Sequence, residues 1–183
     1  RTLDRGLSEF DIRHRLSINY FYSLPKNAFG SGFAHQLLGG WRIGGVMSFR
    51  TGTAFHPLQN VVRRGYLFSA NRPSQLPGFS GELTSGESAG CGGVIPAGET
   101  LGGPERYFDP CVFVAPSAGH LGDVARGRIL GPSVFTMDLS AQKEFTLRGE
   151  MKLQFRGEMF NLPNHPNFAL PSRGNQIVRS GAA

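Results

Sequence analysis

The run Met151-Lys152-Leu153-Gln154-Phe155-Arg156-Gly157-Glu158-Met159 decides the fold of this chain. Its odd positions are apolar apart from Gly157, and all its even positions are polar or charged. A period of two is the pattern of a β-strand, because successive side chains of a strand point to opposite faces of a sheet. The run therefore predicts a strand with one apolar and one polar face.

Three other segments alternate in the same way. The four predicted strands cover about residues 11–24, 41–56, 134–146 and 150–161. These segments are long for strands of a soluble protein. Lys143 is the one charged residue at an apolar position of the third segment, and glycines weaken the pattern of the second.

The last two segments predict a hairpin. Matching their apolar faces requires a loop of odd length, since a two-residue turn would place Phe145 opposite Lys152. The three residues Leu147-Arg148-Gly149 fit, with Gly149 in the left-handed conformation. This register would pair Glu144 with Lys152 and would place Asp138 opposite Glu158.

The stretch of about residues 57–130 is rich in Gly, Pro and Ser and has no sustained period. It is much longer than an ordinary loop. The connections between the four strands therefore run short, very long, short. Outer-membrane barrels alternate compact periplasmic turns with long extracellular loops, so we expect this stretch to be an extracellular loop.

Composition excludes several classes of protein. The 183 residues contain 26 Gly and 12 Pro, and no apolar run reaches the roughly 20 residues of a membrane-spanning helix. The formal charge of +6 comes from basic residues spread along the chain, whereas nucleic-acid binding calls for a basic cluster interleaved with aromatic residues. The chain starts at Arg1 without a Met or a signal-like segment, so we expect a piece of a longer protein.

The pattern predicts an all-β fold, a fragment of an antiparallel transmembrane β-barrel in the outer membrane of a Gram-negative bacterium. Aromatic residues near the segment ends and charged residues along the opposite faces favour this interpretation. A secreted soluble β-sandwich that serves as a binding or adhesion module also alternates, and it remains the alternative.

Strand facing predicts two sets of site residues. The candidates for the barrel lumen are Arg13, Arg15, Asn19, Arg42, Arg50, Asp138, Gln142, Lys152, Gln154, Arg156 and Glu158. The candidates for the lipid face and its aromatic girdle are Leu16, Ile18, Tyr20, Tyr22, Trp41, Phe49, Phe145 and Phe155.

Several stretches are similar to one known family. They are Asp4–Arg15, Leu38–Gly45, Tyr107–Phe113 and Leu153–Asn161 with Asn164–Phe168. Together they resemble the late barrel strands of TonB-dependent receptors of the Oar-like, carboxypeptidase-regulatory-domain-containing group. The pair Arg126-Gly127 departs from this family, in which Arg-Asn is usual.

The resemblance implies a receptor for energised uptake of a scarce solute, such as a siderophore or a glycan. It also implies two partners, the outer-membrane lipid and a TonB complex that is contacted through a plug region not in this chain. Receptors of this group end in a strand that closes on a C-terminal aromatic residue. The tail Gln176–Ala183 has no such residue, so we expect the closing strand to be absent.

Few residues suggest chemistry. Cys91 and Cys111 lie in one Gly-rich region, which favours a disulfide in an oxidising compartment over a metal site. The five histidines are scattered without metal-ligand spacing, and no nucleophile elbow or phosphate loop occurs, so we predict no metal, no cofactor and no enzyme. Asp138 and Glu158 could act as an acid pair in a hydrolase, but ion pairing in a lumen is favoured over this third hypothesis.

Overall fold

The computed structural model describes residues 5–26, 32–59, 72–91, 95–117, 120–171 and 177–178. The chain forms two compact units. The sheet unit contains the described residues of Arg13–Thr51 and Ser133–Asn167. The disulfide unit contains those of Arg1–Ile12, Gly52–Pro132 and Phe168–Ala183. Each unit therefore joins parts of the chain that are distant in sequence.

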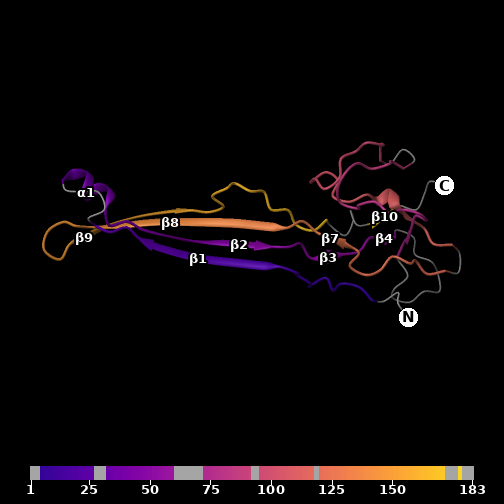
Figure 1. Ribbon diagram of the computed structural model, residues 1–183, viewed down its shortest axis with the longest axis horizontal. Coiled ribbons are helices and arrows are strands. Elements are labelled where there is room, and N and C mark those ends of the chain that lie inside the picture. Colours follow the sequence, from indigo (N-terminus) through magenta and orange to yellow (C-terminus); the bar gives the residue numbers. More distant parts are fainter. Residues whose placement is uncertain are drawn as a thin grey trace. The chain divides into compact units, whose positions relative to one another are not determined.

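The sheet unit is built on four antiparallel strands, in the order β1-β2-β8-β9 (Figure 1). Their bounds are Arg15–Ser23 for β1, Arg42–Arg50 for β2, Val134–Thr146 for β8 and Lys152–Met159 for β9. All four predicted strands are therefore present, and the all-β antiparallel prediction is confirmed. The four strands form an open sheet, not a closed barrel. The β1–β2 and β8–β9 connections leave the same end of this sheet, called here the turn end.

The β8–β9 hairpin differs from its prediction by two residues in register. Its loop is Arg148 to Glu150, because the Leu147 N–H donates to the Met151 carbonyl at 2.9 Å. A turn over Arg148–Met151 closes it, with the Met151 N–H donating to the Arg148 carbonyl at 3.2 Å. Gly149 has a φ of 61° at the second position of this turn, where types I′ and II′ need a positive φ. The left-handed Gly149 is thus confirmed, while the loop starts one residue later than predicted.

The pairs predicted for this hairpin are therefore wrong. Glu144 pairs with Gln154 instead of Lys152, and Ser140 instead of Asp138 pairs with Glu158. A shift of two residues leaves every side chain on its predicted face, because facing depends only on the parity of the register.

The prediction of one strand over residues 41–56 is wrong at its end. Strand β2 stops at Arg50, and the two residues of β3 (Ala54–Phe55) pair with β7 (Ile129–Leu130) in the disulfide unit. Gly52 lies between β2 and β3. A Cβ at this position would come within 1.8 Å of the Gly131 carbonyl oxygen, so the two backbones approach closely only because residue 52 has no side chain.

Residues 57–130 hold more structure than the predicted loop. Much of this stretch surrounds a hydrophobic core that excludes water, and its side chains are almost fully buried. The core residues are Phe55, Leu83, Phe108, Val112, Phe113, Val124 and Ile129. Phe108 makes edge-on ring contacts with both Phe55 and Phe113. Such packing is typical of a water-soluble domain.

The disulfide unit has little regular structure. Besides the β3–β7 pair it contains two short pairs, β5 (Ser74–Gln75) with β6 (Phe113–Val114), and β4 (Leu58–Gln59) with β10 (Ile177–Val178). A 3-10 helix, η1, covers Pro110–Val112. Asp109 caps it by accepting the Cys111 N–H at 2.9 Å, and Pro110 stands at its start.

A short helix, α1 (Phe33–Leu38), lies in the β1–β2 connection at the turn end of the sheet (Figure 1). The alternation of the sequence does not predict it. Among the described residues, no helix is long and apolar enough to cross a membrane.

Candidate functional site

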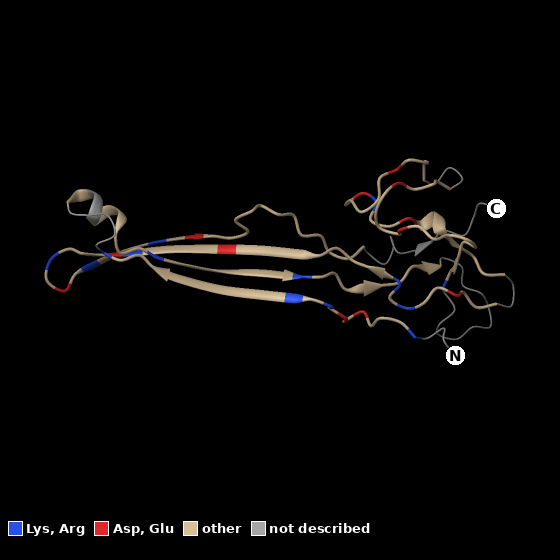
Figure 2. Cartoon of the chain, viewed as in Figure 1, with Lys and Arg blue, Asp and Glu red and all other residues tan. Residues whose placement is uncertain are grey.

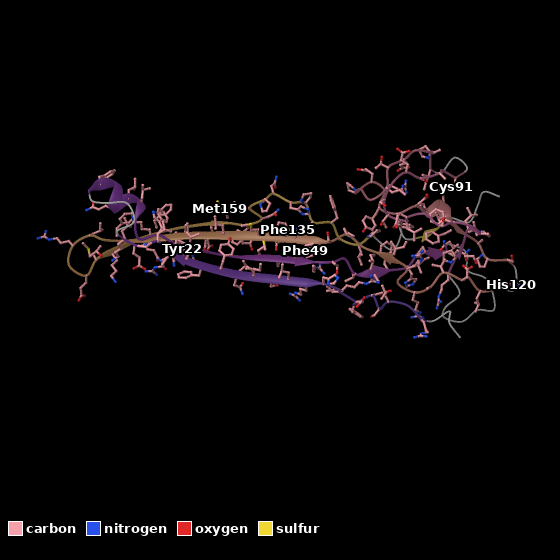
Figure 3. All side chains as sticks on the ribbon, in the orientation of Figure 1. Tyr22, Phe49, Cys91, His120, Phe135 and Met159 are labelled. Carbon is pink, nitrogen blue, oxygen red and sulfur yellow. A yellow bond between two sulfur atoms is a disulfide. The ribbon has the colours of Figure 1, made fainter. Side chains whose placement is uncertain are left out.

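The four-stranded sheet has two chemically different faces. Side chains that are directly opposed in the register share a face. The apolar face contains Leu16, Ile18, Tyr20, Tyr22, Ile43, Met47, Phe49, Phe135, Met137, Leu139, Phe145, Leu153, Phe155 and Met159. Many of these side chains are exposed, including Phe155 at 57% and Leu16 at 50%. Figure 3 labels four members of this face, Tyr22, Phe49, Phe135 and Met159. Soluble proteins rarely leave so continuous an apolar surface uncovered.

All the residues predicted for a lipid face lie on this one face. Seven of them are in strands, and Trp41 directly precedes β2, where its carbonyl accepts the Leu24 N–H at 2.7 Å. The indole of Trp41 packs edge-on against Phe155, with ring centroids 5.8 Å apart. The register thus groups these side chains, while contact with lipid stays a prediction.

The size of the apolar face fits a bilayer. Aromatic side chains stand at both ends of β8, at Phe135 and at Phe145. The ten residue steps from Phe135 to Phe145 measure roughly 33 Å of extended strand. At a tilt of about 40° this length spans roughly 25 Å, the height of the apolar band of an outer-membrane barrel.

Tyr20 shows how a polar group is satisfied in the middle of this face. It stands opposite Gly45, and a Cβ at residue 45 would lie 2.4 Å from the Tyr20 hydroxyl oxygen. The ring therefore lies over the glycine, and its hydroxyl donates to the Asp138 carbonyl at 3.0 Å. A hydroxyl facing hydrocarbon needs such an internal partner. Gly45, which weakens the sequence pattern, is thus explained by the ring that crosses it.

The opposite, polar face holds the residues predicted for the lumen. Its members are Arg15, Ser17, Asn19, Arg42, Ser48, Arg50, Thr136, Asp138, Ser140, Gln142, Glu144, Lys152, Gln154, Arg156 and Glu158. Arg13 precedes β1 and lies outside the strand. Three apolar side chains, Phe21, Val46 and Val134, also belong to this face. In β1 and β2 the charged residues stand at the strand ends, whereas β8 and β9 also carry charged residues within the strand (Figure 2).

Polar contacts cross this face from strand to strand. Arg42 of β2 and Glu144 of β8 form an ion pair at 3.3 Å, and the Ser48 and Thr136 hydroxyls lie 2.7 Å apart. Arg156 also pairs with Glu158 along β9. The carboxylate of Asp138 accepts the backbone N–H of Asn161 at 2.9 Å. These groups can bind polar or charged ligands.

Lys143 is the exception on the apolar face, and its side chain is only 5% exposed. Its ammonium donates to the carbonyls of Gln36, Leu37 and Gly39, at 2.9 Å for Leu37. It also lies 4.9 Å from the ring centre of Phe145. A lysine that sequence alternation marks as misplaced is thus the C-terminal cap of α1.

The segment after β9 is hydrogen-bonded to β8 through the side chain of Asn167. Asn167 donates to the Phe135 carbonyl and accepts the Phe135 N–H, both at 2.8 Å, so its carboxamide replaces a neighbouring strand at that position of β8. Asn161 and Asn164 have positive φ values of 50° and 51°. A turn over Asn161–Asn164 is closed by the Asn164 N–H, which donates to the Asn161 carbonyl at 2.7 Å, and the segment after it shields the edge of β8 beyond the last β9 pair.

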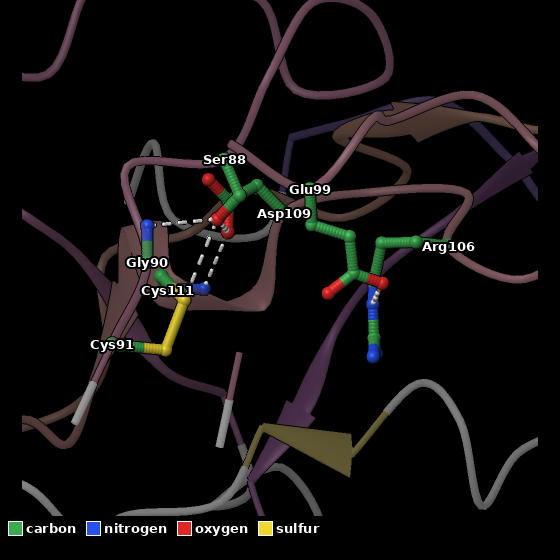
Figure 4. The surroundings of a disulfide bond; sticks show 7 residues. All are labelled: Ser88, Gly90, Cys91, Glu99, Arg106, Asp109 and Cys111. Atoms are coloured by element: carbon green, nitrogen blue, oxygen red, sulfur yellow. Dashed lines mark hydrogen bonds and ion pairs between the residues drawn. A yellow bond between two sulfur atoms is a disulfide. The ribbon is translucent and has the colours of Figure 1, made fainter. Parts of the chain in front are cut away.

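Cys91 and Cys111 form a disulfide with Cα atoms 5.4 Å apart, as predicted (Figure 4). Ser88 and Asp109 beside it are almost fully buried, and the Ser88 hydroxyl donates to the Asp109 carboxylate at 3.0 Å. Asp109 also accepts the Cys111 N–H, and Ser88 accepts the Gly90 N–H at 3.1 Å. The disulfide therefore links two chain segments that a buried network of hydrogen bonds already joins.

His56 of the disulfide unit has a lowered pKa because burial disfavours its charged form. Glu9, 3.7 Å away, acts in the opposite direction, while Arg126 and Arg72 lower the pKa further. Burial also raises the pKa of Tyr107, whose hydroxyl donates to the Leu130 carbonyl at 2.8 Å. In the part of the chain that the structure describes, no three His, Cys, Asp or Glu side chains are grouped to hold a metal ion.

An open sheet with one exposed apolar face of bilayer height and one polar face defines a wall segment of a membrane barrel. The comparison with protein families agrees, since the model of an outer membrane beta barrel domain matches residues 1–182. The chain belongs to this family, and it is an outer-membrane protein of a Gram-negative bacterium. No curated protein and no solved structure matches it. The alternative of a secreted soluble β-sandwich is therefore wrong.

Proposed function

We propose that the chain is part of the barrel of a TonB-dependent receptor that takes up a scarce solute with energy supplied from the inner membrane. The observation that supports this most is the sheet with two unlike faces. In this proposal the apolar face contacts outer-membrane lipid, and the polar face lines the lumen and contacts the plug. The motifs that resemble TonB-dependent receptors support the choice of this class over other barrels.

The charges of the polar face suit a plug or an acidic solute. Arg15 and Arg50 stand directly opposite each other, and opposed like charges destabilise a sheet unless they meet a counter-charge. Arg13 precedes the same end of β1. We expect an acidic group of the plug or of the solute to lie against these arginines.

The disulfide unit is proposed as the extracellular part that first contacts the solute. It holds a shallow pocket of about 390 Å³, which is within the usual size of small-molecule sites. Phe79, Gln75, Asp123 and Arg128 line it, so an apolar ring, an amide and both charge signs are available. This mixture suits a polar solute of the size of a siderophore fragment or a sugar.

We propose no enzymatic role for the chain. Glu158 pairs with Arg156, and Asp138 accepts the Asn161 N–H. The corrected register also removes the direct opposition of the two acids. An acid pair for hydrolysis needs two carboxyl groups facing one substrate bond, so we interpret both acids as parts of the polar network.

Transport can be tested with the full-length gene in a Gram-negative host. The membrane fraction is first run on gels with and without boiling, and a mobility shift is expected for a folded barrel. Growth is then compared on a panel of scarce siderophores, glycans and vitamins, with the TonB complex intact or deleted. Growth that requires both the gene and the TonB complex supports the proposal. A folded barrel whose solute passes equally well without TonB would contradict it.

A further inference from the structure

The β1–β2 connection of the sheet carries apolar side chains that no strand pairing requires. In α1, Phe33 is 79% exposed, and Leu37 and Leu38 are 49% and 46% exposed. The periodicity of the strands does not account for them. Their position at the turn end, next to Trp41, suggests a role at the boundary of the apolar band.

Lys143 fixes α1 on the apolar face of the sheet. The residue belongs to that face, because it stands opposite Phe155 in the register and shares its strand parity with Phe145. Its ammonium reaches over the face to three carbonyl oxygens at the end of α1. Trp41 adds a further contact, since its indole N–H donates to the Leu37 carbonyl at 3.0 Å. The C-terminal end of α1 is therefore held above the apolar side of the sheet.

Lys143 also indicates how deep this part of the sheet lies in the bilayer. A lysine on the lipid face of a barrel is costly at the bilayer centre and nearly free of cost at the interface. The apolar face has no other charged residue in the four strands, and Trp41, Tyr22 and Phe155 stand near Lys143. Aromatic rings of this kind concentrate where hydrocarbon meets headgroups. Lys143 and α1 thus lie at the level at which an apolar band ends.

The charge at this end fits phospholipid headgroups. Lys26, Arg148 and Lys152 are exposed at the turn end, where the acidic residues are Glu150 and the ion-paired Glu144. Interfacial helices combine apolar side chains in the acyl boundary with basic residues near lipid phosphates.

We propose that α1 is a membrane-surface helix, held by Lys143 so that Phe33, Leu37 and Leu38 enter the headgroup–acyl boundary of the phospholipid leaflet at the turn end. The inference rests on the proposed lipid contact of the apolar face. It adds a second contact with lipid, one made by a connection of the sheet and not by its strands.

The test uses the full-length protein, reconstituted in vesicles of phosphatidylethanolamine and phosphatidylglycerol with the native disulfide left oxidised. A fluorophore is attached to a cysteine in the Leu37→Cys variant. Brominated phospholipids then quench it from near the headgroups or from near the bilayer centre. We expect shallow bromines to quench about twofold more than deep ones, because interfacial helices lie near the acyl boundary. Iodide in the water should quench weakly.

Two further labels separate the failure of this inference from failure of the barrel. An Ile18→Cys label on the strand face should be quenched by lipid bromines, and a Glu150→Cys label in the β8–β9 loop should be quenched by iodide. If Ile18 is quenched by lipid while Leu37 responds only to iodide, α1 lies in water and the inference is overturned. If Ile18 is not quenched by lipid, the proposed lipid face is wrong, and the inference is wrong with it.

Lys143→Met tests the link between sheet and helix. This variant keeps the apolar stem of the side chain and removes the three hydrogen bonds, so quenching at Leu37 should move from lipid bromines to iodide. Thr146→Met places the same side chain at an exposed position of β8 on the opposite face and serves as the matched control, with no change expected. If the Lys143→Met barrel still shifts on boiling and the quenching at Leu37 is unchanged, Lys143 does not hold α1. If Lys143→Met does not fold, the Leu37→Cys variant that keeps Lys143 still decides where α1 lies.

Discussion

The two units of the chain are built on opposite principles. In the sheet unit, backbone pairing joins the strands, and large apolar side chains such as Phe155 and Leu16 stay exposed. In the disulfide unit, each described strand is two residues long, but Phe108, Phe113 and Ile129 are almost fully buried. The sheet exposes its apolar surface, as a surface in contact with lipid does, whereas the disulfide unit buries its apolar core away from water.

This difference implies different sources of stability. Hydrophobic burial stabilises the disulfide unit in water, and a covalent crosslink assists it. The sheet gains little burial from its own residues, so it depends on lipid and on neighbouring strands to cover its apolar face and its edges.

The largest effect is expected for Phe108→Ala in the disulfide unit. Removing a buried Phe leaves a cavity and should lower the free energy of unfolding by about 3 to 5 kcal/mol. Hydrogen exchange of amides in this unit, such as that of Asp109, measures the loss. Phe21→Ala is the control, because Phe21 is 69% exposed in the sheet. Equal losses for the two variants would contradict the contrast between the units.

The next effect is expected for the disulfide. Replacing Cys91 and Cys111 by Ser opens a loop with a sequence separation of 20 residues. On the loop-entropy estimate, this change should lower the stability of the disulfide unit by about 3 kcal/mol. Hydrogen exchange should rise in that unit while the gel shift of the barrel on boiling stays unchanged. A loss of the shift would mean that the two units unfold together.

Ile18→Lys and Ser17→Lys compare the two faces of one strand. Ile18 belongs to the apolar face and Ser17 to the polar face. A lysine in the lipid-facing band should cost about 2 kcal/mol at the depth of Ile18, and a lysine in the lumen should cost much less. Urea titration in vesicles, followed by the boiling shift, measures both. A larger loss for Ser17→Lys would reverse the assignment of the faces.

The smallest effect is expected for pH. The folded pKa of His56 is lowered from 6.5, so the folded unit binds fewer protons than the unfolded chain. This contribution to stability is fully present above pH 6.5 and is lost progressively as the pH falls below that value. Hydrogen exchange of the disulfide unit should therefore rise modestly in acid. His56→Gln should flatten this dependence, and an unchanged slope would assign it to other groups.

The residue pattern anticipates the strands well and the connections poorly. Predicted residues 134–146 coincide with β8, since its alternation is nearly unbroken. Helix α1 and the core around Phe108 are not predicted, because the helix is only 6 residues long and the core residues come from distant parts of residues 54–130. The Asp109-Pro110 start of η1 is a local signal that could have indicated order in this stretch.

The candidate site divides in the same way. Which face each lumen or girdle candidate occupies follows from its position in the strand, so the grouping of Arg42 with Arg156, or of Trp41 with Phe155, is predictable. Their actual neighbours are not, because a register shift of two residues changes every pair and no facing. The Arg42–Glu144 ion pair and the Tyr20 hydrogen bond across Gly45 are therefore visible only in the folded sheet.

The sequence by itself determined the β class, the two unlike faces, the left-handed Gly149 and the pairing of the cysteines. These properties depend on strand parity, on the backbone freedom of one glycine, or on the presence of only two cysteines in the sequence. Tertiary structure alone decided the strand register, the pairing of β2 with β8, which are far apart in the sequence, and the use of Lys143 as a cap for α1. Those properties require groups distant in sequence to meet, and the energy of such a meeting depends on geometry that no local pattern contains.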